Sequence, residues 1–130
     1  MANVIEDYRY TAARQWSAIE PSDIAAVGIT DFAQKVLSDM VFVEFPKIGQ
    51  AVTKDGACAV VESVKSASDV YAPLSGSVTK VNANIQNSPE LINHTPYETW
   101  LFKIKISQPT ELNTLLTAST YQALTDQEAS

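Results

Sequence analysis

A short repeat constrains the fold of this chain more than any other feature. Valine, proline and glycine recur with the spacing V-x-x-P-x-x-G in Val43–Gly49 and again, 27 residues later, in Val70–Gly76. Proline cannot donate to a β-ladder and glycine permits positive φ, so each copy predicts a strand end followed by a turn. A chance match of so short a pattern is one explanation. The other is two similar small β units packed face to face, which predicts a flattened β barrel or sandwich.

Hydrophobic patterning predicts short strands, with the helices mostly outside the repeat. Strands are predicted at residues 24–29, 41–45, 57–64, 76–82 and 100–106. The alternation in the last of these predicts one face made of Trp100, Phe102, Ile104 and Ile106 and another made of Leu101, Lys103 and Lys105. Helices are predicted after a cap at Thr30-Asp31, at Ser88-Pro89-Glu90, and beyond Pro109, where Leu112, Leu115 and Leu116 precede a helical tail with Tyr121 and Leu124.

The length indicates one domain. A chain of 130 residues can bury one hydrophobic core, so a single domain over residues 1–130 is expected. Its N-terminal strands would occupy about 8–29, a central hairpin about 57–73 and C-terminal helices about 110–126. The expected class is therefore mainly β with flanking helices.

The charge balance argues against two classes of partner. Acidic residues outnumber basic ones by 15 to 9, and the formal net charge is −6. Nucleic acids and anionic membranes require a basic surface, so neither is expected as a partner. An acidic surface suits basic patches on other proteins, although it could equally serve solubility alone. No targeting signal or membrane-spanning run is recognisable, and the single cysteine, Cys58, fits a reducing compartment.

Residues that usually carry catalysis are scarce, and the sequence predicts neither a catalytic residue nor a metal site. Because His94 is the one histidine and Cys58 the one cysteine, a Cys/His zinc cluster cannot be assembled within the chain. Cys58 lies in an apolar run, where a small buried side chain is expected rather than a reactive thiol. No glycine-rich phosphate loop occurs. The pair Glu62 and Asp69 fits a solvated face better than an acid–base pair.

Lys65 occupies the turn expected between the two copies of the repeat. The stretch E-S-V-K-S-A-S-D runs from Glu62 to Asp69 and surrounds the lysine with small residues. An exposed lysine that only aids solubility is the simplest interpretation. Three features favour another role: small neighbours would let an active site close over the turn, the flanking acids could be recognised by a basic pocket, and a flexible primary amine suits acylation.

At these residues the sequence resembles the H proteins of the glycine cleavage system, a family of lipoyl carriers. The similarity runs from about Tyr10 to Leu124 and is carried by V-G-I-T-D-F-A-Q (27–34), D-M-V-F-V-E (39–44), V-V-E-S-V-K-S-A-S-D (60–69), P-L-S-G (73–76), N-S-P-E-L-I-N (87–93) and W-L-F-K-I-K (100–105). Biotin carriers typically place methionines beside their lysine, and lipoyl domains of 2-oxoacid dehydrogenases usually show Asp-Lys-Ala. Neither pattern occurs around Lys65.

The resemblance implies a barrel-sandwich hybrid of the lipoyl- and biotinyl-carrier type, with internal two-fold pseudo-symmetry of which the repeat would be the trace. Lys65 would carry lipoic acid through an amide bond at the tip of the central hairpin. The residues implied in recognition by the modifying enzyme, or in contact with the arm, are Glu62, Ser63, Val64, Ser66, Asp69 and Gln15. The protein would position the cofactor without itself being a catalyst.

The resemblance also implies the partners. The carrier would take an aminomethyl group from a pyridoxal-phosphate-dependent glycine decarboxylase (P protein) to a tetrahydrofolate-dependent aminomethyltransferase (T protein). A flavin-containing dihydrolipoamide dehydrogenase (L protein) would reoxidise the arm, and a lipoyl-attaching enzyme would load it. A monomer is expected, in a bacterial-type cytoplasm or, if a transit peptide has been removed, in the mitochondrial matrix.

The match departs from the family near the N-terminus. Family members commonly read Tyr-Thr, two further residues, then His-Glu-Trp, whereas here Arg14 and Gln15 precede Trp16. The family glutamate is thought to shelter the loaded arm by contacting its amine. Gln15 keeps the size and an acceptor but loses the charge, so weaker protection is expected. This departure is the one support for an alternative, an H-protein-like lipoyl donor or scaffold. A third possibility, an unmodified interaction protein, predicts that Lys65→Arg changes no activity.

Overall fold

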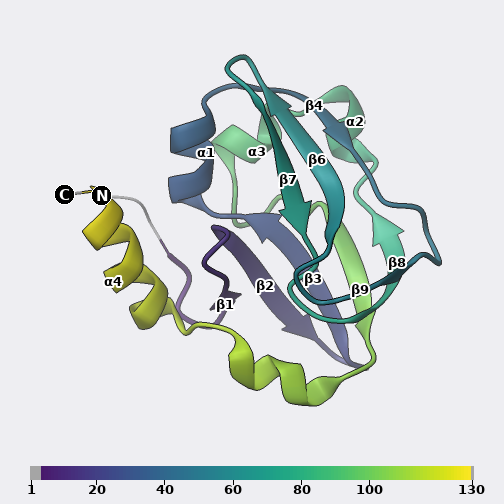
Figure 1. The fold of residues 1–130 in the computed structure, drawn as a ribbon. Coiled ribbons are helices and arrows are strands. Elements are labelled where there is room, and N and C mark those ends of the chain that lie inside the picture. Colours follow the sequence, from purple (N-terminus) through teal and green to yellow (C-terminus); the bar gives the residue numbers. More distant parts are fainter. Residues whose placement is uncertain (1–3, 130) are drawn as a thin grey trace.

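Two antiparallel sheets face each other in the computed structural model, which describes residues 4–129 (Figure 1). The larger sheet has the order β1-β2-β3-β9-β8-β5 and the smaller sheet the order β4-β6-β7. The strands are β1 (Arg9–Tyr10), β2 (Gln15–Glu20), β3 (Ile24–Ile29), β4 (Met40–Glu44), β5 (Ala51–Val52), β6 (Ala57–Ser63), β7 (Ala67–Tyr71), β8 (Gly76–Val81) and β9 (Phe102–Ile106). The helices are α1 (Asp31–Leu37), α2 (Asn84–Asn87), α3 (Leu91–His94), the 3-10 helix η1 (Pro109–Thr114) and α4 (Ala118–Ala129).

Each copy of the repeat connects a strand of the smaller sheet to a strand of the larger sheet. The first leads from β4 in the smaller sheet to β5 in the larger one, and the second leads from β7 to β8 in the same way. β5 and β8 then pair with each other, with Val52 opposite Gly76. The two glycines of the repeat are needed for different reasons. Gly49 has φ +89°, which side chains disfavour, whereas a Cβ on Gly76 would lie 2.0 Å from the carbonyl oxygen of Lys105. The predicted β sandwich is confirmed.

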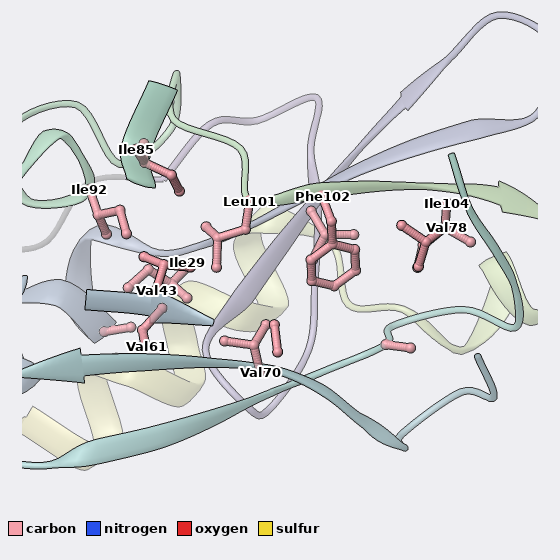
Figure 2. Close-up of a cluster of buried hydrophobic side chains, with 14 of the residues drawn as sticks. Ile29, Val43, Val61, Val70, Val78, Ile85, Ile92, Leu101, Phe102 and Ile104 are labelled. Carbon is pink, nitrogen blue, oxygen red and sulfur yellow. The ribbon is translucent and has the colours of Figure 1, made fainter. Parts of the chain in front are cut away.

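The core lies between the two sheets and is closed at one side by the short helices. Figure 2 shows side chains of both sheets pointing into the space between them, among them Val61 and Val70 of the smaller sheet and Phe102 of the larger one. Ile85 of α2 and Ile92 of α3 complete this cluster and are fully buried. Burial of a side chain of this size contributes roughly 1.5–3 kcal/mol, so the helices are held mainly by these contacts.

A second apolar cluster attaches the N-terminal strands to the C-terminal helix. Tyr10 and Tyr121 stack with ring centroids 4.8 Å apart, and Trp16 packs in the same cluster. The hydroxyl groups of Thr30 and Tyr121 are 2.7 Å apart, which ties α4 to the residue that caps α1. The two ends of the described chain are thereby packed on one side of the larger sheet.

Two expectations for the C-terminal third were wrong. Residues after Pro109 form a 3-10 helix rather than an amphipathic α-helix, and Leu115 is extended with ψ 151°. The reason is tertiary, because Leu116 and Tyr10 exchange backbone hydrogen bonds of 2.7 and 2.8 Å. Leu101, expected on the exposed face of its strand, is fully buried, because β9 begins only at Phe102 and the Leu101 amide donates to the Val27 carbonyl.

Within residues 4–129, no helix is both long and apolar enough to span a membrane.

Candidate functional site

The turn at the tip of the β6–β7 hairpin is built by a serine side chain. Residues Ser63 to Ser66 form it, and the Ser63 amide donates to the Ser66 carbonyl at 2.8 Å. The Ser63 hydroxyl accepts from the amides of Lys65 and Ser66 and donates to the Ser66 carbonyl, all at 3.2 Å. The last paired residues are Glu62 and Ala67, and a loop of this length is most often built around a type I turn, which needs no positive φ. Val64 and Lys65 accordingly have negative φ, and the Ser63 hydroxyl accepts the hydrogen bonds of two amides in the loop.

Lys65 is exposed on this turn. The turn joins β6 to β7 and lies at the end of the smaller sheet (Figure 1). Its ammonium donates to the carbonyl of Val36 at 3.1 Å. That carbonyl belongs to the last turn of α1, where helical carbonyls lack an intrahelical partner and favour a positive charge. Since the contact is exposed, water competes with it and the amine is accessible.

The other residues expected around Lys65 take different positions. Val64, with 64% of its surface exposed, and Ser66 project from the tip. Glu62 and Asp69 are exposed on the two strands of the hairpin, opposite Ala67 and Val60 respectively. Ser63 is buried at 9% exposure and its hydroxyl is bonded within the turn, so it stabilises the turn in addition to being a small neighbour of the lysine. Val64 and Ser66 thus flank the lysine on the turn, whereas Glu62 and Asp69 lie on β6 and β7.

Two neighbouring cavities lie between the hairpin and the N-terminal strands. The first has a volume of about 110 Å³ and is lined by Ala13, Arg14, Gln15, Ile29, Ala33, Leu37, Val61, Ser68, Asp69 and Val70. The second has a volume of about 280 Å³ and is lined by Thr11, Ala12, Ala13, Gln15, Asp55, Tyr71, Ala72 and Pro73. Ala13 and Gln15 belong to both linings, so they mark the boundary between the two spaces.

Gln15 joins the two sheets at this boundary. It is only 2% exposed, and its side-chain amide donates to the Tyr71 carbonyl at 2.6 Å while its oxygen accepts from the Tyr71 amide at 2.8 Å. The bonds connect β2 of the larger sheet to β7 of the smaller one. Gln15 and Asp69 both line the smaller cavity, but both polar atoms of the Gln15 side chain already have partners. The guanidinium of Arg14 lies 4.9 Å from the centroid of the Phe32 ring.

Sequence reasoning missed the groups that receive these contacts. The acceptor for Lys65 and both partners of Gln15 are backbone atoms, on which the sequence carries no signal. In the sequence, Asn93 is marked only as the last residue of the segment N-S-P-E-L-I-N. In the structure it hydrogen-bonds to the segment that joins α1 to β4.

The residues considered for catalysis or metal binding offer little chemistry. Cys58 is half-buried on β6, and burial raises the pKa of its thiol to about 11, so it is protonated at neutral pH. His94 is exposed at the end of α3 rather than in a loop. In the part of the chain that the structure describes, no three His, Cys, Asp or Glu side chains come together to hold a metal ion.

Comparisons with known proteins agree on one family. The family model described as "Glycine cleavage H-protein" matches residues 8–128. A "Glycine cleavage system H protein" of Photorhabdus laumondii is 50% identical over 129 residues, covering 98% of this chain and 99% of the relative, and one of Pectobacterium atrosepticum is 47% identical with the same coverage. The crystal structure of a glycine cleavage system H protein from Mycobacterium marinum superimposes with a TM-score of 0.83 at 34% identity, covering 95% of this chain and 99% of that one.

Proposed function

The chain belongs to the glycine cleavage H-protein family, and from that premise we propose that Lys65 is its site of covalent lipoylation. The protein is the lipoyl carrier of a glycine cleavage system. The observation that carries the assignment to Lys65 is its place at the exposed tip of a turn whose neighbouring side chains are small. An enzyme can enclose such a tip without meeting a bulky side chain other than Val64.

The residues present fit an amide-linked arm. Acylation needs the neutral amine, so the attaching enzyme must remove a proton from the Lys65 ammonium. The amide that forms carries no charge, and the attraction between Lys65 and the C-terminal end of α1 is weakened accordingly. Release from that helix end would free the side chain to swing. When bound, the lipoyl group supplies the disulfide that accepts and delivers the aminomethyl group.

The 110 Å³ cavity is the place where this chain would shelter the arm. Its walls include the apolar side chains of Ile29, Leu37 and Val61, and also Asp69, whose carboxylate can accept hydrogen bonds from a cationic amine. Gln15 contributes a neutral wall there, because both of its polar atoms bond to Tyr71. Asp69 is accordingly the acidic residue we assign to the loaded amine.

The proposed partners follow from the same role. The carrier would visit a glycine decarboxylase, an aminomethyltransferase and a dihydrolipoamide dehydrogenase, and a lipoyl-attaching enzyme would load it. It contributes no catalytic residue of its own; tethering raises the concentration of the arm at whichever enzyme is docked. The acidic net charge of −6 suits enzymes with basic docking surfaces. We expect a monomer that works in a bacterial-type cytoplasm or a mitochondrial matrix.

Intact mass spectrometry tests the assignment directly. Protein produced in a lipoate-replete host with an active ligase should carry one lipoyl group, and peptide mapping should place it on Lys65. Lys65→Arg should remove the added mass, whereas Lys80→Arg, an exposed lysine on β8, should retain it. An unmodified Lys65 in the presence of active ligase would refute the proposal. Glycine–bicarbonate exchange with the decarboxylase should then require the lipoylated form.

The alternative role as a lipoyl donor or scaffold is not favoured. The relatives that match over nearly their whole length carry the H-protein name. The departure at Arg14 and Gln15, which was its support in the sequence, coincides with a structural contact between the sheets.

A further inference from the structure

We propose that Asn93 is a positioning residue that fixes the Lys65 turn for the enzyme that modifies it. The proposal rests on the proposed lipoylation of Lys65. Asn93 acts through the α1–β4 corner, by which we mean residues 36–40, where the chain leaves α1 and enters β4. No part of this role requires Asn93 to touch the lysine.

The Asn93 side chain bonds to the corner on both sides of Asp39. Its oxygen accepts from the Met40 amide at 2.9 Å, and its nitrogen donates to the Ser38 carbonyl at 2.9 Å. The same nitrogen lies 3.1 Å from the side-chain oxygen of Gln34. Ser38 has φ 74° and ψ −159°, a conformation found almost only in glycine that costs another residue roughly 1–3 kcal/mol. The two bonds from Asn93 to the corner therefore help to hold a backbone conformation that the local sequence does not favour.

The Lys65 turn is attached to this corner. The Val64 amide donates to the Asp39 carbonyl at 2.9 Å, and that carbonyl belongs to the residue between the two that Asn93 binds. Ser63 pairs with Met40 across β6 and β4, and the Lys65 ammonium donates to the Val36 carbonyl. A continuous series of hydrogen bonds thus runs from Asn93 through Asp39 to Val64, the neighbour of Lys65.

An anchored turn should be recognised more readily than a loose one. If the corner relaxes, the Val64 amide loses its acceptor and the turn is held by its own internal bonds alone. Ordering a loose turn on binding costs free energy, so the modifying enzyme would capture the lysine less often. Once captured, the same amine is presented to the same active site. The defect should therefore appear in KM for the acceptor protein and leave kcat nearly unchanged.

The experiment compares Asn93→Ala with Asn82→Ala in the full apo chain. Asn82 is also a half-buried asparagine, but its side chain bonds to the Trp100 carbonyl and the Asn84 amide instead of the corner. Exchange of the Val64 amide is measured by NMR, and lipoylation by a purified lipoate ligase is followed by intact mass. Asn93→Ala should speed Val64 exchange and raise KM by roughly five- to tenfold, as expected for about 1 kcal/mol of lost anchoring, with kcat within twofold. Asn82→Ala should change neither quantity.

Two outcomes would overturn the proposal. One is an unchanged rate of Val64 exchange in folded Asn93→Ala, and the other is a KM no higher than that of Asn82→Ala. If Asn93→Ala does not fold, Asn93→Asp carries the same test, since it keeps the acceptor for Met40 and loses the donor to Ser38. If the wild type is not lipoylated, the proposed function fails on its own, and the exchange measurement still decides whether Asn93 anchors the turn.

Discussion

Replacing Gln15 with alanine should destabilise the protein by about 2–3 kcal/mol, because it removes both hydrogen bonds that join β2 to β7. Each buried hydrogen bond contributes about 1 kcal/mol net, and the lost methylene adds about 0.8 kcal/mol. The full penalty for unsatisfied Tyr71 atoms should not appear, because the flanking cavities of about 110 and 280 Å³ let water reach them. For a domain of this size the melting temperature should fall by roughly 6–12 °C.

Urea titration at pH 7, followed by circular dichroism, measures this loss. The matched control is Gln50→Ala, which removes one exposed side-chain bond from the Lys47 amide and should cost under about 0.5 kcal/mol. A Gln15→Ala protein within 0.5 kcal/mol of the wild type would refute the idea that this amide holds the sheets together.

Gln15→Glu separates the structural from the electrostatic part of the argument. The glutamate can still accept from the Tyr71 amide, but when ionised it cannot donate to the Tyr71 carbonyl. We therefore expect a lower free energy of unfolding than that of the wild type at pH 7. The difference should diminish toward acidic pH, where a protonated carboxyl restores the donor. On the lipoylated protein, the added negative charge should lengthen the lifetime of the aminomethyl-loaded arm if charge is what the cavity lacks. An unchanged lifetime would count against the charge argument.

Two further predictions concern the larger sheet and the single thiol. Gly28→Ala should cost about 2–3 kcal/mol in urea titrations, because its Cβ would lie 2.5 Å from the buried ring of Trp16; a loss under 0.5 kcal/mol would show that the ring can move aside. Cys58 should react with a disulfide reagent at pH 8 roughly a hundredfold more slowly than an ordinary thiol, since its pKa is raised to about 11. Its rate should rise about tenfold per pH unit up to pH 10, and equal rates in folded and urea-unfolded protein would contradict this.

Much of the fold was predictable because the chain is locally consistent. Three signals in the sequence depend only on neighbouring residues: the repeat, the alternation of β-prone residues and the Thr30 cap. The structure has strands where the first two predict them and begins α1 directly after Thr30. The expectations failed where a distant contact decided the conformation. The backbone pairing of Leu116 with Tyr10 ended a helix that the leucine spacing favoured.

The site was predictable to a smaller extent. Lys65 is a candidate from the sequence because small residues and a turn surround it. The side-chain chemistry of Ser63 could have been inferred from the tendency of serine hydroxyls to bond to the backbone two or three residues on. The pairing of Gln15 with Tyr71 could not, because it joins residues 56 apart in sequence through main-chain atoms.

Because the turn is stabilised by the Ser63 side chain, its backbone conformation does not restrict which residue occupies the tip. A hairpin that needs positive φ restricts its central positions to glycine, asparagine or aspartate, and none of these can carry an acyl arm on a primary amine. Here the hydroxyl of Ser63 satisfies the turn, so the fold accepts any ordinary side chain at position 65. Under the proposed function, the requirement for lysine comes from lipoylation. Substitutions at this position are for that reason informative reagents, since they would remove the proposed attachment point and leave the hydrogen bonds of the turn in place.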